Sequence, residues 1–240
     1  MRNISTVVLS ALLLSQSMTS FAAGSEEIFG VWGKVKLQGN FKSLSPSLNK
    51  FKWAVINETR TRDDSSKGSR FYQDRLSGQV GYQINNNASL WLGYAHLWTS
   101  PLDDPSFQES RPYQDFVWNQ DISTFKLTSR SRMEQRIQET TGDTGYRARQ
   151  LVKISHPLPL MNGLSVYVGD EVLFYMNENT FGKKGFSENR IFSGLSYQAT
   201  KKIGADLGYM GQYVDTTSDK IHIPITYKFI FVIILIDRSD

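Results

Sequence analysis

The chain has 240 residues, with 27 basic and 23 acidic side chains and a formal net charge of +4. It contains no cysteine, which excludes disulfides, cysteine-bearing zinc sites and thiol nucleophiles. The basic residues are scattered among polar ones, so the sequence predicts no nucleic-acid-binding surface.

The first 23 residues have the three-part layout of a signal peptide. Arg2 supplies the positive charge, residues 7–14 are apolar except for Ser10, and residues 20–23 offer a small-residue cleavage region. The apolar part is too short to span a membrane as a helix. We therefore predict a cleaved signal peptide over residues 1–23; an uncleaved amphipathic N-terminus is the alternative.

Residues 24–229 alternate between apolar and polar side chains in segments separated by turn-forming residues, the pattern of antiparallel strands. No apolar stretch long enough for a transmembrane helix follows the signal peptide, so a membrane-spanning form would have to be a closed barrel. The mean hydropathy of −0.36 fits a barrel, because only alternate strand residues face lipid. The predicted strands lie near residues 28–39, 49–62, 69–84, 88–99, 109–118, 122–139, 145–156, 162–175, 186–198, 202–214 and 219–229.

Single-chain bacterial barrels have even strand numbers, so we expect an antiparallel transmembrane β-barrel of about twelve strands, with ten as the alternative. Short turns near Asn86 and Lys201 would face the periplasm, and the longer connections over residues 100–108 and 177–187 would face outward. A recurring Gly-Tyr pair, as at residues 93–94, suits an interfacial tyrosine beside a glycine on the crowded inner face. A soluble lipocalin-like binding barrel shows the same alternation and remains open.

Charged side chains recur on one face of several predicted strands, most clearly over residues 125–137. An Arg or Lys facing lipid at mid-depth costs about 2–4 kcal/mol, so we expect these side chains to face the lumen. They would form either an ion-pair network that fills the interior or a narrow, porin-like pore for anions. The candidates are Glu58, Arg60, Arg130, Arg132, Glu134, Arg136, Arg147, Arg149, Lys153, Glu171, Glu188 and Arg190.

A lipid-active outer-membrane hydrolase is the rival functional class. No histidine is followed two residues later by a serine, the spacing we would expect in a barrel lipase. His222 with Asp206 on the neighbouring strand is a weak candidate for part of a Ser-His-Asp group, and His96 is another. The sequence has no phosphate-binding glycine loop and no metal-ligand spacing, so we predict no metal, no cofactor and no assigned catalytic residue.

Several blocks in order resemble a bacterial envelope family known as domain of unknown function 2490. They are Trp32, Leu90–Tyr94, Glu109–Gln114, Arg132–Arg136, Arg147–Arg149, Asp170–Phe174 and Glu188–Tyr197. The resemblance implies an outer-membrane-type barrel and supplies no established activity. The expected partners are outer-membrane lipid and the barrel-assembly machinery, with no nucleic acid and with any ligand left open.

The end of the sequence departs from this pattern. Barrels of this kind usually stop at a terminal aromatic residue, which Phe229 fits. Residues 230–236 form an unbroken apolar run that does not alternate and is too short for a spanning helix. We predict a barrel over residues 24–229 and an atypical apolar tail over residues 230–240.

Overall fold

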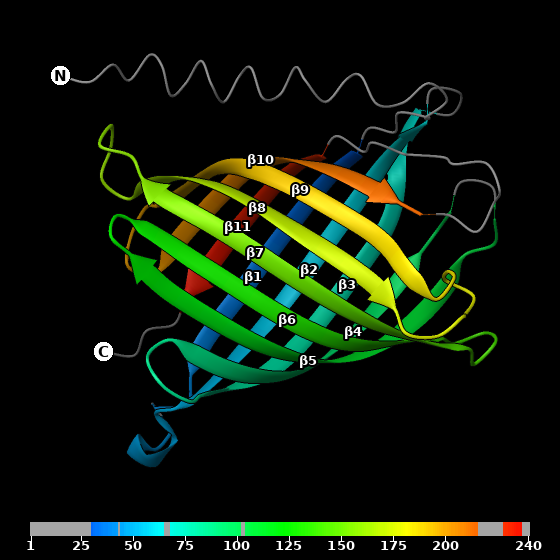
Figure 1. Cartoon of the computed structure of the whole chain (residues 1–240), viewed down its shortest axis with the longest axis horizontal. Coiled ribbons are helices and arrows are strands. Elements are labelled where there is room, and N and C mark those ends of the chain that lie inside the picture. Colours follow the sequence, from blue (N-terminus) through cyan, green and yellow to red (C-terminus); the bar gives the residue numbers. More distant parts are fainter. Residues whose placement is uncertain (1–29, 43, 65–67, 102–103, 216–227, 237–240) are drawn as a thin grey trace.

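The computed structural model describes residues 30–42, 44–64, 68–101, 104–215 and 228–236. These residues form eleven strands that close into a barrel (Figure 1). The predicted signal peptide and His222 lie outside the described residues. The elements are β1 (Gly30–Asn40), a 3-10 turn η2 (Pro46–Leu48), β2 (Phe51–Asp64), β3 (Gly68–Gln83), β4 (Ala88–Thr99), β5 (Phe107–Ile122), β6 (Phe125–Gln138), β7 (Thr144–Pro157), β8 (Leu164–Tyr175), β9 (Gly185–Gln198), β10 (Ile203–Val214) and β11 (Lys228–Ile236). No helix in these ranges is long and apolar enough to span a membrane.

Each strand pairs antiparallel with the next, from β1 to β11, and the parallel pair β1–β11 closes the ring. The predicted all-β antiparallel barrel is confirmed, but its strand number is not the expected twelve in the described part of the chain. With an odd number of alternating strands, the first and last run in the same direction, so their pairing has to be parallel.

The last strand corrects the prediction for the C-terminal end. Residues 230–236, expected to lie outside the barrel, belong to β11 and pair with strands on both sides. Ile230 lies opposite Trp32 of β1, and Phe231 lies opposite Leu207 of β10. A run rich in Ile and Val favours the extended conformation, and pairing on both sides satisfies its backbone groups. The predicted strand 219–229 lies mostly outside the described residues.

The other ten strands coincide with their predicted segments to within a few residues, except that β5 extends further at its C-terminal end. They run diagonally around the barrel (Figure 1). One end, the short-turn end, carries the connections at residues 84–87, 123–124 and 199–202. The opposite end, the long-loop end, carries those at residues 100–106 and 176–184.

The two faces of the barrel wall differ sharply in chemistry. Every strand from β1 to β10 exposes at least two large apolar side chains on its outer face, such as Leu92 (68 % exposed) and Val168 (53 %). The residues between them point inward and include buried charges such as Glu134 (1 %). The strand alternation therefore separates an apolar outside from a charged inside.

Inward-facing glycines make room for aromatic rings of neighbouring strands. A Cβ atom at Gly93 would lie 2.2 Å from the Tyr113 ring, and one at Gly208 would lie 2.3 Å from the Tyr167 hydroxyl. The tyrosines that follow these glycines, Tyr94 and Tyr209, are exposed on the outer face. The Gly-Tyr pairs thus combine a close inner approach with an outward aromatic side chain.

Candidate functional site

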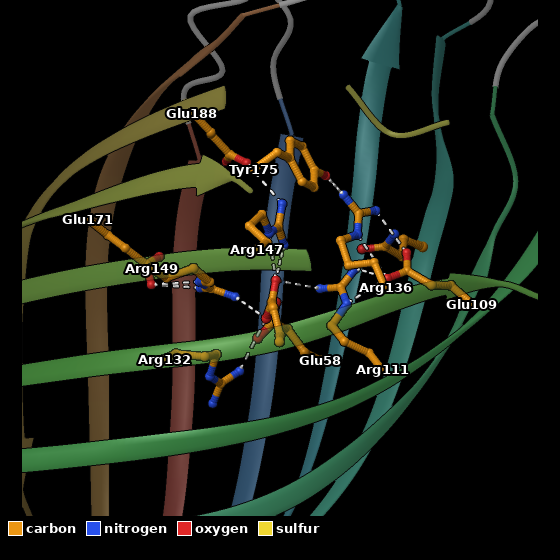
Figure 2. A network of polar contacts seen from close by, with 12 residues as sticks. Glu58, Glu109, Arg111, Arg132, Arg136, Arg147, Arg149, Glu171, Tyr175 and Glu188 are labelled. Carbon is orange, nitrogen blue, oxygen red and sulfur yellow. Dashed lines mark hydrogen bonds and ion pairs between the residues drawn. The ribbon is translucent and has the colours of Figure 1, made fainter. Parts of the chain in front are cut away.

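A network of ion pairs occupies the barrel interior (Figure 2). Glu134 of β6 is one of its main junctions. Arg147 Nε donates a hydrogen bond of 2.6 Å to Glu134 Oε1, and Arg149 Nη1 donates one of 3.2 Å to Oε2. The guanidinium groups of Arg132 and Arg111 approach to 3.9 and 4.0 Å. One carboxylate therefore serves four arginines from three adjacent strands.

Glu171 of β8 forms a second junction. Its Oε1 accepts hydrogen bonds from Arg149 Nη2 at 2.7 Å and from Arg130 Nη2 at 2.6 Å, and Arg190 Nη1 lies 3.3 Å from Oε2. Arg130 lies on β6, which is not adjacent to β8 in the ring. This contact consequently links non-neighbouring strands across the inner face of the wall.

Glu109 of β5 forms a third junction toward the long-loop end. Arg136 donates from Nε and Nη2 to the two carboxylate oxygens at 2.9 and 2.8 Å, a bidentate pair, and Arg111 Nε donates at 2.7 Å. Arg136 also donates to the hydroxyl of Tyr175. Such charge-assisted bidentate pairs are among the strongest protein hydrogen bonds and fix the orientation of both groups.

Three further pairs complete the network. Arg132 binds Asp115 through two hydrogen bonds of 2.6 Å and packs over the Tyr113 ring, 3.9 Å from its centroid. Glu188 with Arg190, and Glu58 with Arg60, are same-face neighbours two residues apart on one strand. Buried charges are tolerated only when they are paired, and the removal of one partner is strongly destabilising.

The structure places all twelve sequence-predicted charged side chains on the inner face. Eleven of them take part in ion pairs, whereas Lys153 lies over the Tyr167 ring, 5.1 Å from its centroid. The sequence interpretation missed Glu109, Arg111 and Asp115 as network members, although their alternation on one face of β5 was a usable signal.

The family described as "Protein of unknown function (DUF2490)" matches residues 29–222 of this chain. The chain belongs to the DUF2490 family. An uncharacterized protein of Methylorubrum extorquens strain AM1 is 30% identical over 158 residues, which cover 65% of this chain and 69% of that protein. The resemblance seen in the sequence is thus confirmed, and the matched range of this DUF2490 protein holds every strand that contributes to the network.

Two of the enzyme candidates, Asp206 and His96, lie in the described part of this DUF2490 protein, whereas His222, the expected partner of Asp206, does not. Asp206 lies on the inner face of β10. His96 lies on the outer face of β4, directly opposite Ser110 of β5. Its Nε2 is 2.9 Å from Gln108 Oε1 and its Nδ1 is 3.3 Å from Glu139 Oε1. His96, the separate candidate, therefore lies near a serine and a glutamate.

That outer cluster does not have the geometry of a catalytic triad. Ser110 Oγ donates to Glu139 Oε1 at 2.7 Å, and each ring nitrogen of His96 has an oxygen partner other than the serine hydroxyl. A triad requires the serine to donate to the imidazole. A pocket of about 380 Å³ borders Gln108 and Glu139, but His96 and Ser110 do not line it. The polar contacts of this cluster connect β4, β5 and the loop after β6, which is a structural role.

Proposed function

We propose that this DUF2490 protein is a structural β-barrel of the bacterial outer membrane. The observation that carries the proposal is the distribution of side chains: exposed apolar residues surround the outer face, and charged residues are buried inside. A soluble barrel has the opposite arrangement. A continuous exposed apolar surface of this kind is expected at a lipid or protein contact.

The charged interior favours a structural role over an open pore. Glu109, Glu134 and Glu171 each bind several arginines, and all three are at most 4 % exposed. Side chains held in this way occupy the long-loop half of the interior. A small barrel has little interior volume beyond that filled by its side chains. A lipocalin-like function would instead need an interior cavity and a polar outer surface.

Cell fractionation with heat-modifiable gel mobility tests the location, and planar-bilayer recording tests the filled interior. We expect the protein in the outer-membrane fraction, a band that shifts on boiling, and no steady ion conductance. A soluble periplasmic protein whose band does not shift would overturn the membrane assignment. A steady conductance from the folded protein would overturn the structural role and favour the pore.

A further inference from the structure

The two halves of the barrel interior differ in how their charges are satisfied. Toward the long-loop end, the inward-facing charges are buried in the ion-pair network. Toward the short-turn end, several inward-facing cations remain partly exposed to solvent, among them Lys34 and Lys36 of β1, Arg130 of β6 and Lys153 of β7. We refer to these four residues as the cationic cluster.

The members of the cationic cluster face one another from opposite sides of the barrel. β1 and the pair β6–β7 lie across the ring from each other. Lys36 nevertheless interacts electrostatically with Lys34, Arg130 and Lys153. Like charges that converge on one region repel each other, and the repulsion is strong where solvent screening is reduced.

Most carboxylates near this cluster already pair with arginines outside it. Among the described residues, no carboxylate lies within 4 Å of Lys34, Lys36 or Lys153. Arg130 contacts Glu171, but that carboxylate also binds Arg149 and Arg190. Glu58 lies opposite Lys34 in the strand register and pairs with Arg60, Asp115 is held in a bidentate pair by Arg132, and Asp206 is aligned with Lys34 through β11. The cluster therefore carries more positive charge than these carboxylates leave available, since three of the four already bind arginines outside it.

Two buried polar atoms on β3 lack a partner beside the cluster. Arg75 Nε and Ser77 Oγ have no hydrogen-bond partner among the described residues, and the two residues are 8 % and 2 % exposed. The strand register aligns Arg75 with Lys34, and Ser77 with Lys36, through β2. A buried donor without an acceptor costs about 1–3 kcal/mol, so an acceptor from outside the chain would be stabilising here.

We propose that the cationic cluster, with Arg75 and Ser77, binds a phosphate-class oxyanion inside the barrel. A phosphate group carries more than one negative charge and has several oxygens, so it can accept from lysine, arginine and hydroxyl donors at once. The partial exposure of the cluster gives the anion access from the short-turn side. Free phosphate and the phosphate of a lipid headgroup share this chemistry. The inference goes beyond the structural role and does not depend on the membrane location.

Isothermal titration of the full chain, folded in an uncharged, phosphate-free detergent, tests this site. Inorganic phosphate is titrated in one arm and dihexanoyl phosphatidic acid in the other. We expect saturable binding at one site in at least one arm. Binding of inorganic phosphate identifies the free anion as sufficient, and binding of the lipid alone identifies a headgroup ligand.

Two charge-removing variants locate the site. Lys36→Met is expected to weaken binding at least about tenfold, because a charge-assisted contact is lost. Lys126→Met removes an exposed cation from β6 at the same end and is expected to bind like the wild type. Heat-modifiable mobility checks that each variant folds. If Lys36→Met does not fold, Lys153→Met replaces it as the test of binding. No binding in either arm, or equal weakening by Lys36→Met and Lys126→Met, would overturn the proposal.

Discussion

Arg147 and Glu134 lie directly opposite each other on β7 and β6, and Arg147 Nε donates a hydrogen bond of 2.6 Å to Glu134 Oε1. Both residues are buried, at 4 % and 1 % exposed. Three further arginines approach the same carboxylate. Glu134 is therefore the residue on which the charge balance of the interior depends most.

Glu134→Gln is expected to lower the free energy of unfolding by about 3–5 kcal/mol, because it leaves several buried guanidinium groups without their carboxylate. Equilibrium unfolding in urea, with the barrel in detergent micelles, measures the change. Glu178→Gln, in the exposed loop after β8, is the matched control and should change stability by less than about 0.5 kcal/mol. A loss below about 1 kcal/mol for Glu134→Gln would contradict the central position of this residue.

Gly93→Ala is expected to destabilise the barrel by about 1–3 kcal/mol, because the new methyl group would overlap the Tyr113 ring. The same unfolding measurement applies. Gly78→Ala is the control, since a Cβ atom there meets nothing within 4 Å. If both variants lowered the free energy of unfolding equally, the loss would come from backbone propensity and not from overlap with the Tyr113 ring.

The strand positions could be predicted because the barrel wall imposes a period of two on the sequence. β4 was predicted with its observed bounds, Ala88–Thr99, since apolar outer residues alternate there with an inner set that includes Ser89, Gly93 and Thr99. β11 was missed because its run has no alternation. A strand's pairing partners depend on ring closure, which is not visible in the segment itself.

The candidate site was predictable as a set of inward-facing residues but not as a set of contacts. Parity alone places Arg130 and Glu171 on the inner face. Their hydrogen bond of 2.6 Å joins two strands that are not neighbours, so it depends on the curvature of the closed barrel. The surplus of cations around Lys36 likewise appears only when β1 and β6 are seen to face each other.

Hydrogen bonds to Asp143 connect two loops at the long-loop end, and the strength of this connection should depend on pH. The Thr180 hydroxyl and backbone N–H both donate to Asp143 Oδ2 at 2.6 Å, which lowers the pKa of Asp143 below its ordinary value of 3.8. Because the pKa of Asp143 is lowered in the folded protein, its hydrogen bonds contribute their full stability at pH values above the ordinary pKa. This stability is lost as the pH falls through the lower pKa of the folded state.

Hydrogen exchange at the Thr180 amide measures this effect. After correction for intrinsic exchange, its protection should be high near neutral pH and should fall once Asp143 is protonated. Asp143→Asn should give low protection across the whole range, because the charged acceptor is absent. Protection that is independent of pH in the wild type would show that the carboxylate does not hold the loop.

Removal of two interlocked side chains should open the interior. The double variant Glu134→Ala/Arg147→Ala is expected to show stepwise ion conductance in planar bilayers, whereas the wild type shows none. Glu178→Ala/Lys183→Ala removes an opposite-charge pair from the exposed loop and should stay closed. A double variant that folds, as shown by its heat-modifiable band, and remains closed would mean that other side chains block the path.

The proposed membrane location requires that lipid surrounds the apolar outer face of the barrel. Because the chain has no cysteine, single cysteines along β8 can be spin-labelled without background, and collision rates can be recorded in phospholipid vesicles. We expect high accessibility to oxygen and low accessibility to a water-soluble nickel complex at Val166, Val168 and Phe174, with low oxygen accessibility at Tyr167 and Leu173. Outer positions that collide freely with the nickel complex would contradict the membrane-spanning barrel.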